Sequence, residues 1–334
     1  MLILSADGVR RAVTMSEAME AVASAFARLS NQQADVPLRP HVAVPPADGL
    51  LLVMPAYLAG SGAGAPGALG VKLLSLYLHN PERHHLPSIN ALVLAFDTEN
   101  GQPLALMDGG WLTALRTGAA SGVATRLLAR RDARTLALFG AGAQALPQAW
   151  AVCVARPIER VWLVNRTPAH AERLAGQLRA FGPPISADVR VATNAAEALR
   201  EADVICCATA SPTPIFDDAD LRPGAHINGI GAYRPTMQEV PAATVARARV
   251  VVDQRQAAWA EAGDLIVPRE QGLIDESHIA GELGELVAGR ISGRADDAQI
   301  TFFKSVGNAV QDVAVAQLAV QRARALGLGT EVSL

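Results

Sequence analysis

The residues from Leu138 to Ala145 read LFGAGAQA, and they close an apolar, strand-like run. In dinucleotide-binding proteins, a Gly-x-Gly turn joins a strand to a helix whose first amides bind the pyrophosphate. Gly140 permits the tight turn, Gly142 lets the backbone approach the ligand, and Ala145 allows the helix to pack closely. An ordinary turn of small residues would read the same way, so the signal depends on its strand-to-helix context. The candidate cofactor-binding residues in this turn are Gly140, Ala141, Gly142, Ala143 and Gln144.

The chain around this turn alternates between strand-like and helix-like patterns. Apolar runs recur at residues 135–140, 160–165, 189–194, 203–210, 226–232 and 249–254. Runs that are apolar on both faces predict a parallel sheet covered by helices on each side. The predicted fold class is therefore α/β, with a Rossmann-type doubly wound parallel sheet domain.

The N-terminal part of the chain predicts a separate α+β domain. Thr14 to Glu17 has capping-box spacing and predicts the start of a helix. Strand-like runs follow at residues 51–57, 70–77, 89–97 and 103–109, and the glycine-rich stretch 59–70 predicts a mobile surface loop. A long helix is expected over residues 305–326. We therefore predict a first domain at 1–115, completed by 305–334, and a Rossmann domain at 116–304.

Composition limits the classes of function. Half of the 334 residues are hydrophobic and the formal net charge is -3, so neither nucleic acid nor an anionic membrane is an expected partner. No apolar window approaches the roughly 18 residues of a membrane span, and no signal peptide is expected. The three cysteines and seven histidines lack metal-ligand spacing. We expect a soluble, cytoplasmic protein without a metal site.

The end of the second run in the α/β part bears on the choice of cofactor. Asn165, Arg166 and Thr167 follow this run, where a dinucleotide-binding protein often carries an acid for the ribose 2′-hydroxyl. Arg166 instead suits a 2′-phosphate through charge-assisted hydrogen bonds, although a solvated loop arginine also fits this position. The sequence favours NADP(H), with NAD(H) possible. Asn165, Arg166, Thr167 and the later Thr209 complete the cofactor-binding candidates of the loops.

Three cations form a second group of candidates. Lys72 lies within the apolar run GVKLLSLY, where an inward charge needs a partner. Arg39 lies in a proline-bearing segment, and Arg116 lies in LRTGAASG. Spacing alone leaves all three open to interpretation as ordinary surface cations.

Several long motifs resemble the ornithine cyclodeaminase/mu-crystallin family. They are VMPAY, MDGGWLTALRTGAASGVATRLLAR followed by GAGAQA, VWLVNRT, PGAHINGIGAYRP and TFFKSVGNAVQD, and they cover nearly the whole chain. The resemblance implies a homodimer with an N-terminal substrate-binding and dimerisation domain, acting on amino or imino acids with NAD(H) or NADP(H). By position it implies that Arg39, Lys72 and Arg116 bind the substrate carboxylate, with Lys72 and Arg116 as catalytic candidates. It also implies that Thr117 contacts the cofactor and that Lys304 lies near the nicotinamide.

Two positions distinguish the reactions within the family. The cyclodeaminases are similar to this chain around HINGIGAYRP but carry an aspartate in place of Tyr233 and a glutamate in place of Leu52. Cyclisation of ornithine needs acid–base groups for the amine and ammonia protons, so the loss of both carboxylates argues against it. Mu-crystallin-like ketimine reductases also lack the aspartate.

The functional hypothesis is an NADPH-preferring reductase of cyclic imino acids. It would convert Δ1-pyrroline-2-carboxylate or Δ1-piperideine-2-carboxylate to proline or pipecolate, with Lys72 or a bound water supplying the proton. Three other functions stay open: an NAD-dependent ornithine cyclodeaminase, an alanine-type amino-acid dehydrogenase, and a non-catalytic protein that binds NADPH and a ligand.

Overall fold

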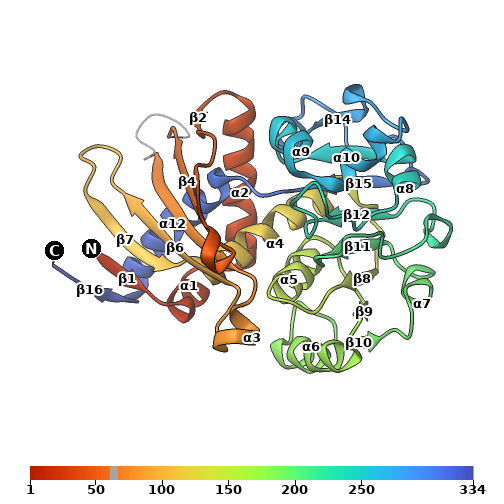
Figure 1. Ribbon diagram of the computed structural model, residues 1–334, viewed down its shortest axis with the longest axis horizontal. Helices are drawn as coiled ribbons and strands as arrows, with labels where there is room; N and C mark the ends of the chain where they lie inside the picture. The colour runs from red at the N-terminus through yellow and green to blue at the C-terminus, as the bar shows by residue number, and fades with distance from the viewer. Residues whose placement is uncertain (61–66, 334) are drawn as a thin grey trace. The chain divides into compact units, whose positions relative to one another are not determined.

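The structure, a computed structural model, describes residues 1–60 and 67–333 (Figure 1). The chain forms two compact units. Unit 1 contains Met1–Arg116 and Asn308–Leu334, and unit 2 contains Thr117–Gly307. The chain passes from unit 1 to unit 2 within helix α4 (Gly109–Leu128) and returns just before helix α12 (Ala309–Leu326). Residues 305–307, which the sequence assigned to the first domain, belong to unit 2.

Unit 1 is built on a mixed eight-stranded sheet. The strand order is β16-β1-β7-β6-β5-β4-β2, and β3 pairs with β4 alone. All pairs are antiparallel except β1 with β7, which run parallel. The strands are β1 (Leu2–Leu4), β2 (Ala34–Asp35), β3 (His41–Val44), β4 (Gly49–Leu58), β5 (Ala68–Tyr77), β6 (Ile89–Phe96), β7 (Pro103–Asp108) and β16 (Thr330–Glu331).

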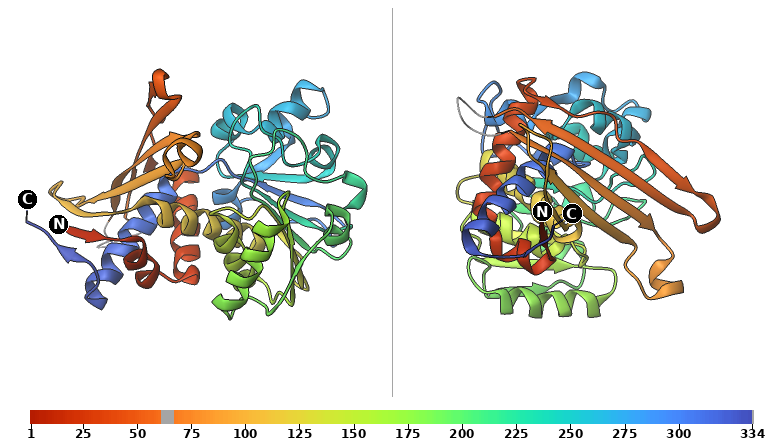
Figure 2. Two further views of the ribbon diagram at one scale, coloured as in Figure 1. Left: turned by 60° about the horizontal axis from the view of Figure 1, so that its bottom comes forward. Right: turned by 90° about the vertical axis from the view of Figure 1, so that its left-hand side faces the viewer.

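Helices α1 (Ala6–Ala12), α2 (Met15–Ser30) and α12 pack on one face of this sheet (Figure 2). Helix α2 begins at the predicted capping box, because Thr14 Oγ1 accepts from the Glu17 backbone while the Glu17 carboxylate accepts from the Thr14 backbone. Helix α12 packs against β4, β5 and β6 and against α2. Besides α4 and α12, the helices are α1 (Ala6–Ala12), α2 (Met15–Ser30) and α3 (Asn80–His84), with a 3₁₀ turn at Pro45–Ala47.

Apart from Lys72, strands β4, β5 and β6 of unit 1 carry mainly apolar residues on both faces. The face towards α12 is buried, and its residues include Met54, Gly70, Lys72, Val93 and Ala95. The opposite face carries side chains that are at least partly exposed, among them Val53, Val71, Leu73, Leu92 and Leu94. A sheet that faces water on one side normally has polar residues there, so this second apolar face is unusual.

The predicted loop at residues 59–70 is shorter than its composition suggests. Residues 68–70 already belong to β5, where Ala68 pairs with Leu58 and Gly70 pairs with both Ala56 and Ala95. Residues 61–66 lie outside the described part of the chain, so the prediction for them is not addressed.

Unit 2 is a doubly wound domain on an eight-stranded parallel sheet. Its strand order is β10-β9-β8-β11-β12-β15-β13-β14, and every pair is parallel. This confirms the predicted Rossmann-type α/β class. The strands are β8 (Thr135–Phe139), β9 (Arg160–Val164), β10 (Asp188–Val191), β11 (Val204–Cys207), β12 (His226–Gly229), β13 (Arg249–Val252), β14 (Ile279–Glu282) and β15 (Thr301–Lys304).

Helices cover both faces of this sheet (Figure 1). They create two cores, so successive residues of β8 face different cores: Leu136 and Leu138 enter one, and Ala137 and Phe139 enter the other. The uninterrupted apolar runs of the sequence follow from this arrangement. The helices are α5 (Ala145–Ala155), α6 (Pro168–Phe181), α7 (Ala195–Leu199), α8 (Ala242–Arg247), α9 (Arg255–Glu261), α10 (Gly263–Glu270) and α11 (Leu283–Val287), with 3₁₀ turns at Asp218–Asp220 and Glu276–His278.

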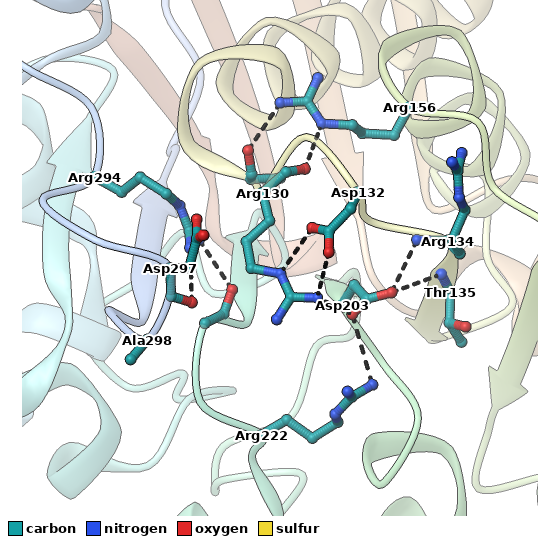
Figure 3. Close-up of polar contacts among 12 residues, drawn as sticks. Arg130, Asp132, Arg134, Thr135, Arg156, Asp203, Arg222, Arg294, Asp297 and Ala298 are labelled. Carbon is teal, nitrogen blue, oxygen red and sulfur yellow. Dashed lines mark hydrogen bonds and ion pairs between the residues drawn. The ribbon is translucent and has the colours of Figure 1, made fainter.

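A polar cluster anchors the amino ends of β8 and β11 (Figure 3). The Asp203 carboxylate accepts from the backbone amides of Arg134 and Thr135 and pairs with Arg130. Arg156 donates to backbone carbonyls at and just beyond the end of α4, including that of Arg130. These contacts satisfy carbonyls that a helix end leaves free. The cluster therefore fixes the sheet edge opposite to the Gly-x-Gly turn.

Candidate functional site

The Gly-x-Gly turn follows β8, as the sequence predicts. Gly140 has a φ of 97°, and a Cβ at this position would lie 2.5 Å from the carbonyl oxygen of Ala208. An added Cβ on Gly142 would meet no protein atom within 4 Å. The fold itself therefore requires the first glycine, whereas the second leaves room for a ligand close to the backbone.

The turn presents unpaired amides at the start of α5. The amide of Ala141 donates to Asn165 Oδ1 at 3.1 Å, and the amide of Ala145 donates to the carbonyl of Gly142 at 3.0 Å. Between them, three amides have no acceptor among the described residues. Amides at a helix N-terminus attract anions because the helix dipole adds to their own partial charge. These three belong to Gly142, Ala143 and Gln144.

A cavity of about 640 Å³ opens beside the turn. It is lined by loops that follow β8, β9 and β11, which is the carboxyl edge where doubly wound sheets bind ligands. Seven of the predicted cofactor residues line it: Gly140, Ala141, Gly142, Asn165, Arg166, Thr167 and Thr209. Thr117, Ala143, Gln144 and Lys304 are not part of its lining. Open amides, a glycine without steric hindrance and an exposed arginine together suit a dinucleotide.

Lys304 lies in a buried ion pair instead of on the cavity wall. Its Nζ lies 2.9 Å from Asp264 Oδ2, and neither side chain is exposed. The other oxygen of Asp264 accepts from the backbone amides of Glu239 and Val240, at 2.7 and 3.0 Å. A contact between Lys304 and the nicotinamide remains a prediction.

In unit 1, two of the predicted cations converge on one carboxylate. Lys72 Nζ lies 2.7 Å from Asp312 Oδ2, and Arg116 Nε lies 3.0 Å from Asp312 Oδ1. Arg116 also donates to Gln311 Oε1. Lys72, Asp312 and Gln311 are buried, and Arg116 is 6% exposed. The pair of acceptors from α12 thus orients the cations that β5 and α4 supply.

The charges in this cluster perturb Lys72. Burial lowers the pKa of Lys72 to about 8, the positive charges of Arg116 and Arg39 act in the same direction, and Asp312 opposes them. Arg39 is half-buried and lies in the segment that joins β2 to β3. The buried Lys72 and Arg116 carry two positive charges against the one negative charge of Asp312, so an anionic ligand would be attracted. A lysine with this pKa can also exchange a proton near neutral pH.

Asp312 and Gln311 were not among the sequence candidates, although the quoted motif TFFKSVGNAVQD contains both. A signal was present, because Asp312 is the one acid of the alanine- and valine-rich helix α12. A buried lysine in an apolar strand calls for such a partner. Glu239 and Asp264 were also absent from the sequence candidates.

The two positions that distinguish the subfamilies do not carry acids. Leu52 lies on β4 and pairs with His41 of β3 and Leu74 of β5. Tyr233 is half-buried, and the Arg234 guanidinium carbon lies 5.6 Å from the centre of its ring. Within the described residues, no cluster of histidine, cysteine and acidic side chains could hold a metal ion. No described helix is long and apolar enough to cross a membrane.

The chain is similar to known reductases and dehydrogenases over nearly its whole length. A Δ(1)-pyrroline-2-carboxylate reductase of Bacillus cereus is 40% identical over 334 residues, with 99% of each chain covered. The solved structure of Thermococcus litoralis Δ(1)-pyrroline-2-carboxylate reductase in complex with NADH and L-proline has a TM-score of 0.92 at 40% identity, covering 99% of this chain and 100% of that one. An archaeal alanine dehydrogenase dimer with bound NAD has a TM-score of 0.90 at 33% identity, covering 100% and 99%.

The family model described as "Ornithine cyclodeaminase/mu-crystallin family" matches residues 1–326. The match extends through the turn in unit 2 and through the cluster in unit 1. It confirms the resemblance that the sequence motifs indicate. The chain belongs to the ornithine cyclodeaminase/mu-crystallin family.

Proposed function

We propose that this protein is an NAD(P)H-dependent reductase of cyclic imino acids. It reduces Δ1-pyrroline-2-carboxylate to proline and Δ1-piperideine-2-carboxylate to pipecolate. The observation that carries the proposal is the buried cluster of Lys72, Arg116 and Asp312. A cationic cluster with one fixed carboxylate suits a small carboxylate-bearing substrate, and relatives of 40% identity are Δ(1)-pyrroline-2-carboxylate reductases.

The residues of unit 1 bind and orient the substrate. Arg39, Lys72 and Arg116 hold its carboxylate, which fixes the imine carbon for attack. Asp312 keeps Lys72 and Arg116 in place and limits their rotation. A reduced nicotinamide nucleotide held at the Gly-x-Gly turn of unit 2 would supply the hydride for the C=N carbon.

The nitrogen needs one proton to complete the reduction. As the hydride adds to carbon, the C=N π electrons move to nitrogen, and a proton from Lys72 gives the secondary amine. Its pKa of about 8 places Lys72 mostly in the protonated form at neutral pH. A bound water is the alternative donor, and a substrate that enters as the iminium brings the proton itself.

Turnover assays test the proposal. Purified protein is incubated with each ketimine and with NADPH or NADH, and the loss of reduced-nicotinamide absorbance is followed. Turnover of either ketimine supports the proposal. Ammonia release from ornithine, or reduction of pyruvate only with ammonia, would contradict it in favour of a cyclodeaminase or an alanine-type dehydrogenase. Nucleotide binding without any turnover would identify a non-catalytic binding protein.

A preference for NADP(H) over NAD(H) is a further part of the proposal. Arg166 lines the cavity and is exposed, and a guanidinium suits the charge and geometry of a 2′-phosphate. The variant Arg166→Ala should raise the KM for NADPH by about tenfold and leave the KM for NADH nearly unchanged, as the loss of one charge-assisted contact implies. Equal effects on both cofactors would count against the preference.

We also propose that the protein is a homodimer that pairs through the second apolar face of the unit 1 sheet. Val53, Val71, Leu73 and Leu92 lie on this face, away from α2 and α12. Leu92 is 47% exposed, and Leu51 and Tyr57 on β4 are exposed as well. Self-association removes such a face from water, and one structural neighbour is a dimer.

A cytoplasmic location belongs to the same proposal. All three cysteines, Cys153, Cys206 and Cys207, are free thiols and buried. Free cysteines without disulfides are typical of a reducing compartment. Expression as a fusion to a fluorescent protein, followed by cell fractionation, tests this location.

A further inference from the structure

A buried carboxylate, Glu239, joins two loops at the carboxyl edge of the unit 2 sheet. One of its oxygens accepts from the backbone amide and the hydroxyl of Thr209, at 2.5 and 2.8 Å. The other accepts from the backbone amides of Gly231 and Ala232, at 2.7 and 3.0 Å. Thr209 follows β11 and Gly231 follows β12, so a single side chain sets the separation of the two loops.

The two loops lie so close that only glycine fits at position 231 of the second loop. A Cβ on Gly231 would lie 2.0 Å from the carbonyl oxygen of Thr209 and 2.6 Å from the Glu239 carboxylate. Thr209 and its neighbours Ala208, Ala210, Ser211 and Pro212 line the cofactor cavity. The Glu239 contacts therefore fix the position of the Thr209 loop, which forms one wall of the cavity.

The Asp264–Lys304 ion pair is hydrogen-bonded to the backbone of Glu239. Asp264 accepts from the backbone amide of Glu239 at 2.7 Å and pairs with Lys304 at 2.9 Å. All three charged side chains are fully buried. A chain of contacts thus runs from Lys304 through Asp264 to Glu239, and from there to the loop of Thr209.

We infer that Glu239 is a positioning residue for dinucleotide binding, whose carboxylate must be ionised to hold Thr209 against the cofactor cavity. The inference needs dinucleotide binding in unit 2 and is independent of imine reduction. Nothing in it requires Glu239 to touch the cofactor.

The chemistry of the contacts explains why ionisation matters. Three donors are backbone N–H groups, which cannot turn away, and a carboxylate can accept from all of them. A protonated carboxyl carries a hydrogen on one oxygen and loses acceptor capacity there, which leaves a buried donor without a partner.

The surroundings of Glu239 place its titration near neutrality. Burial raises the pKa of Glu239 to about 7, the negative charge of Asp264 acts in the same direction, and Lys304 and the hydrogen bonds from Thr209 oppose this shift. The nearby thiols of Cys206 and Cys207 are neutral in this range, because burial raises the pKa of both. As the pH falls through about 7, Glu239 gains a proton and dinucleotide affinity should fall.

The test is the Kd for NADH, measured by fluorescence over a pH range that spans neutrality, with no substrate present. In the natural protein, the Kd should rise as the pH falls through about 7. The variant Glu239→Gln mimics the protonated form, because its amide N–H₂ faces the same donors. Its Kd at alkaline pH should be about tenfold higher than that of the natural protein and should not change across neutrality.

A second variant, Thr209→Val, tests the same inference if Glu239→Gln folds poorly. Thr209→Val removes one hydrogen bond to the ionised carboxylate, which raises the pKa of Glu239 and should move the inflection in Kd to higher pH. If Glu239 had only a structural role, the Thr209→Val substitution would not move this inflection.

Two controls exclude other causes. His170 also lines the cavity, so His170→Asn must retain the inflection near neutrality. Glu17 accepts from the amide and hydroxyl of Thr14, as Glu239 does from Thr209, but lies in unit 1, so Glu17→Gln must leave the Kd unchanged. The inference is overturned if Glu239→Gln retains the natural Kd and inflection, or if His170→Asn alone removes the inflection.

Discussion

At the residue scale, Asp312 holds two cations that would otherwise be buried without a counter-charge. Lys72 is 1% exposed, and Arg116 is 6% exposed. The removal of one partner from a buried pair leaves an uncompensated charge, which costs far more than an exposed ion pair does. The cluster therefore matters for the stability of unit 1 as well as for ligand binding.

The variant Asp312→Asn should lower the free energy of unfolding by about 3–5 kcal/mol, because it leaves Lys72 and Arg116 unpaired. Urea titration followed by circular dichroism measures this change. As a control, Lys72→Met combined with Asp312→Leu should lose less, since it also removes one of the buried cations. An unchanged free energy of unfolding in Asp312→Asn would show that the pair does not hold unit 1 together.

The reaction rate should depend on the protonation of Lys72. Because burial lowers the pKa of Lys72 to about 8 in the free protein, kcat/KM should fall as the pH rises through that value and Lys72 loses its proton. Lys72→Arg keeps the charge but cannot release a proton in this range, so its lower kcat/KM should not vary there. If the natural protein keeps a constant kcat/KM through this pH, water or the iminium substrate supplies the proton.

At this scale, the sequence could not predict the long-range contacts of the buried charges. Lys72 was recognisable because a charge in an apolar run needs a partner. The partner lies 240 residues away, on a helix whose packing only the fold reveals. Glu239 gives no local signal either, because its four donors come from two loops that meet only in the folded sheet.

At the element scale, the turn between β8 and α5 is the feature that the sequence predicts best. Its glycine spacing and its strand-to-helix context are local, so no distant contact is needed to recognise it. The start of α12 was predicted less well, at residue 305 instead of Ala309. The backbone amides of Val306 and Gly307 donate to the Asp253 carboxylate, which holds this segment out of the helix. Asn308 then caps the start of α12.

The two glycines of the turn should respond differently to substitution. Gly140→Ala should destabilise unit 2 by about 1–3 kcal/mol, because of its positive φ and the clash with Ala208. Gly142→Ala should leave stability nearly unchanged and should weaken NADH binding, since the added methyl group occupies open space beside the amides. Denaturant titration and NADH fluorescence separate the two effects. Equal loss of stability in both variants would contradict this reading.

At the scale of the whole molecule, the second apolar face of the unit 1 sheet predicts self-association. Leu92→Arg places a charge on this face at a position that is 47% exposed in the single chain. We expect the variant to elute as a monomer with retained helix and strand content, because a charge buried at an interface is strongly unfavourable. Light scattering after size exclusion measures the mass. A natural protein that is monomeric, or a variant with an unchanged mass, would contradict the proposed interface.

We propose that unit 1 binds the carboxylate of a cyclic imine, which then accepts a hydride. The most direct measurement compares kcat/KM for Δ1-pyrroline-2-carboxylate with that for Δ1-pyrroline, which has the same ring and imine but no carboxylate. We expect that loss of the carboxylate lowers kcat/KM by about a thousandfold or more, as the loss of several charge-assisted contacts implies. Similar values for the two imines, or no turnover of the carboxylate-bearing imine with either cofactor, would contradict it.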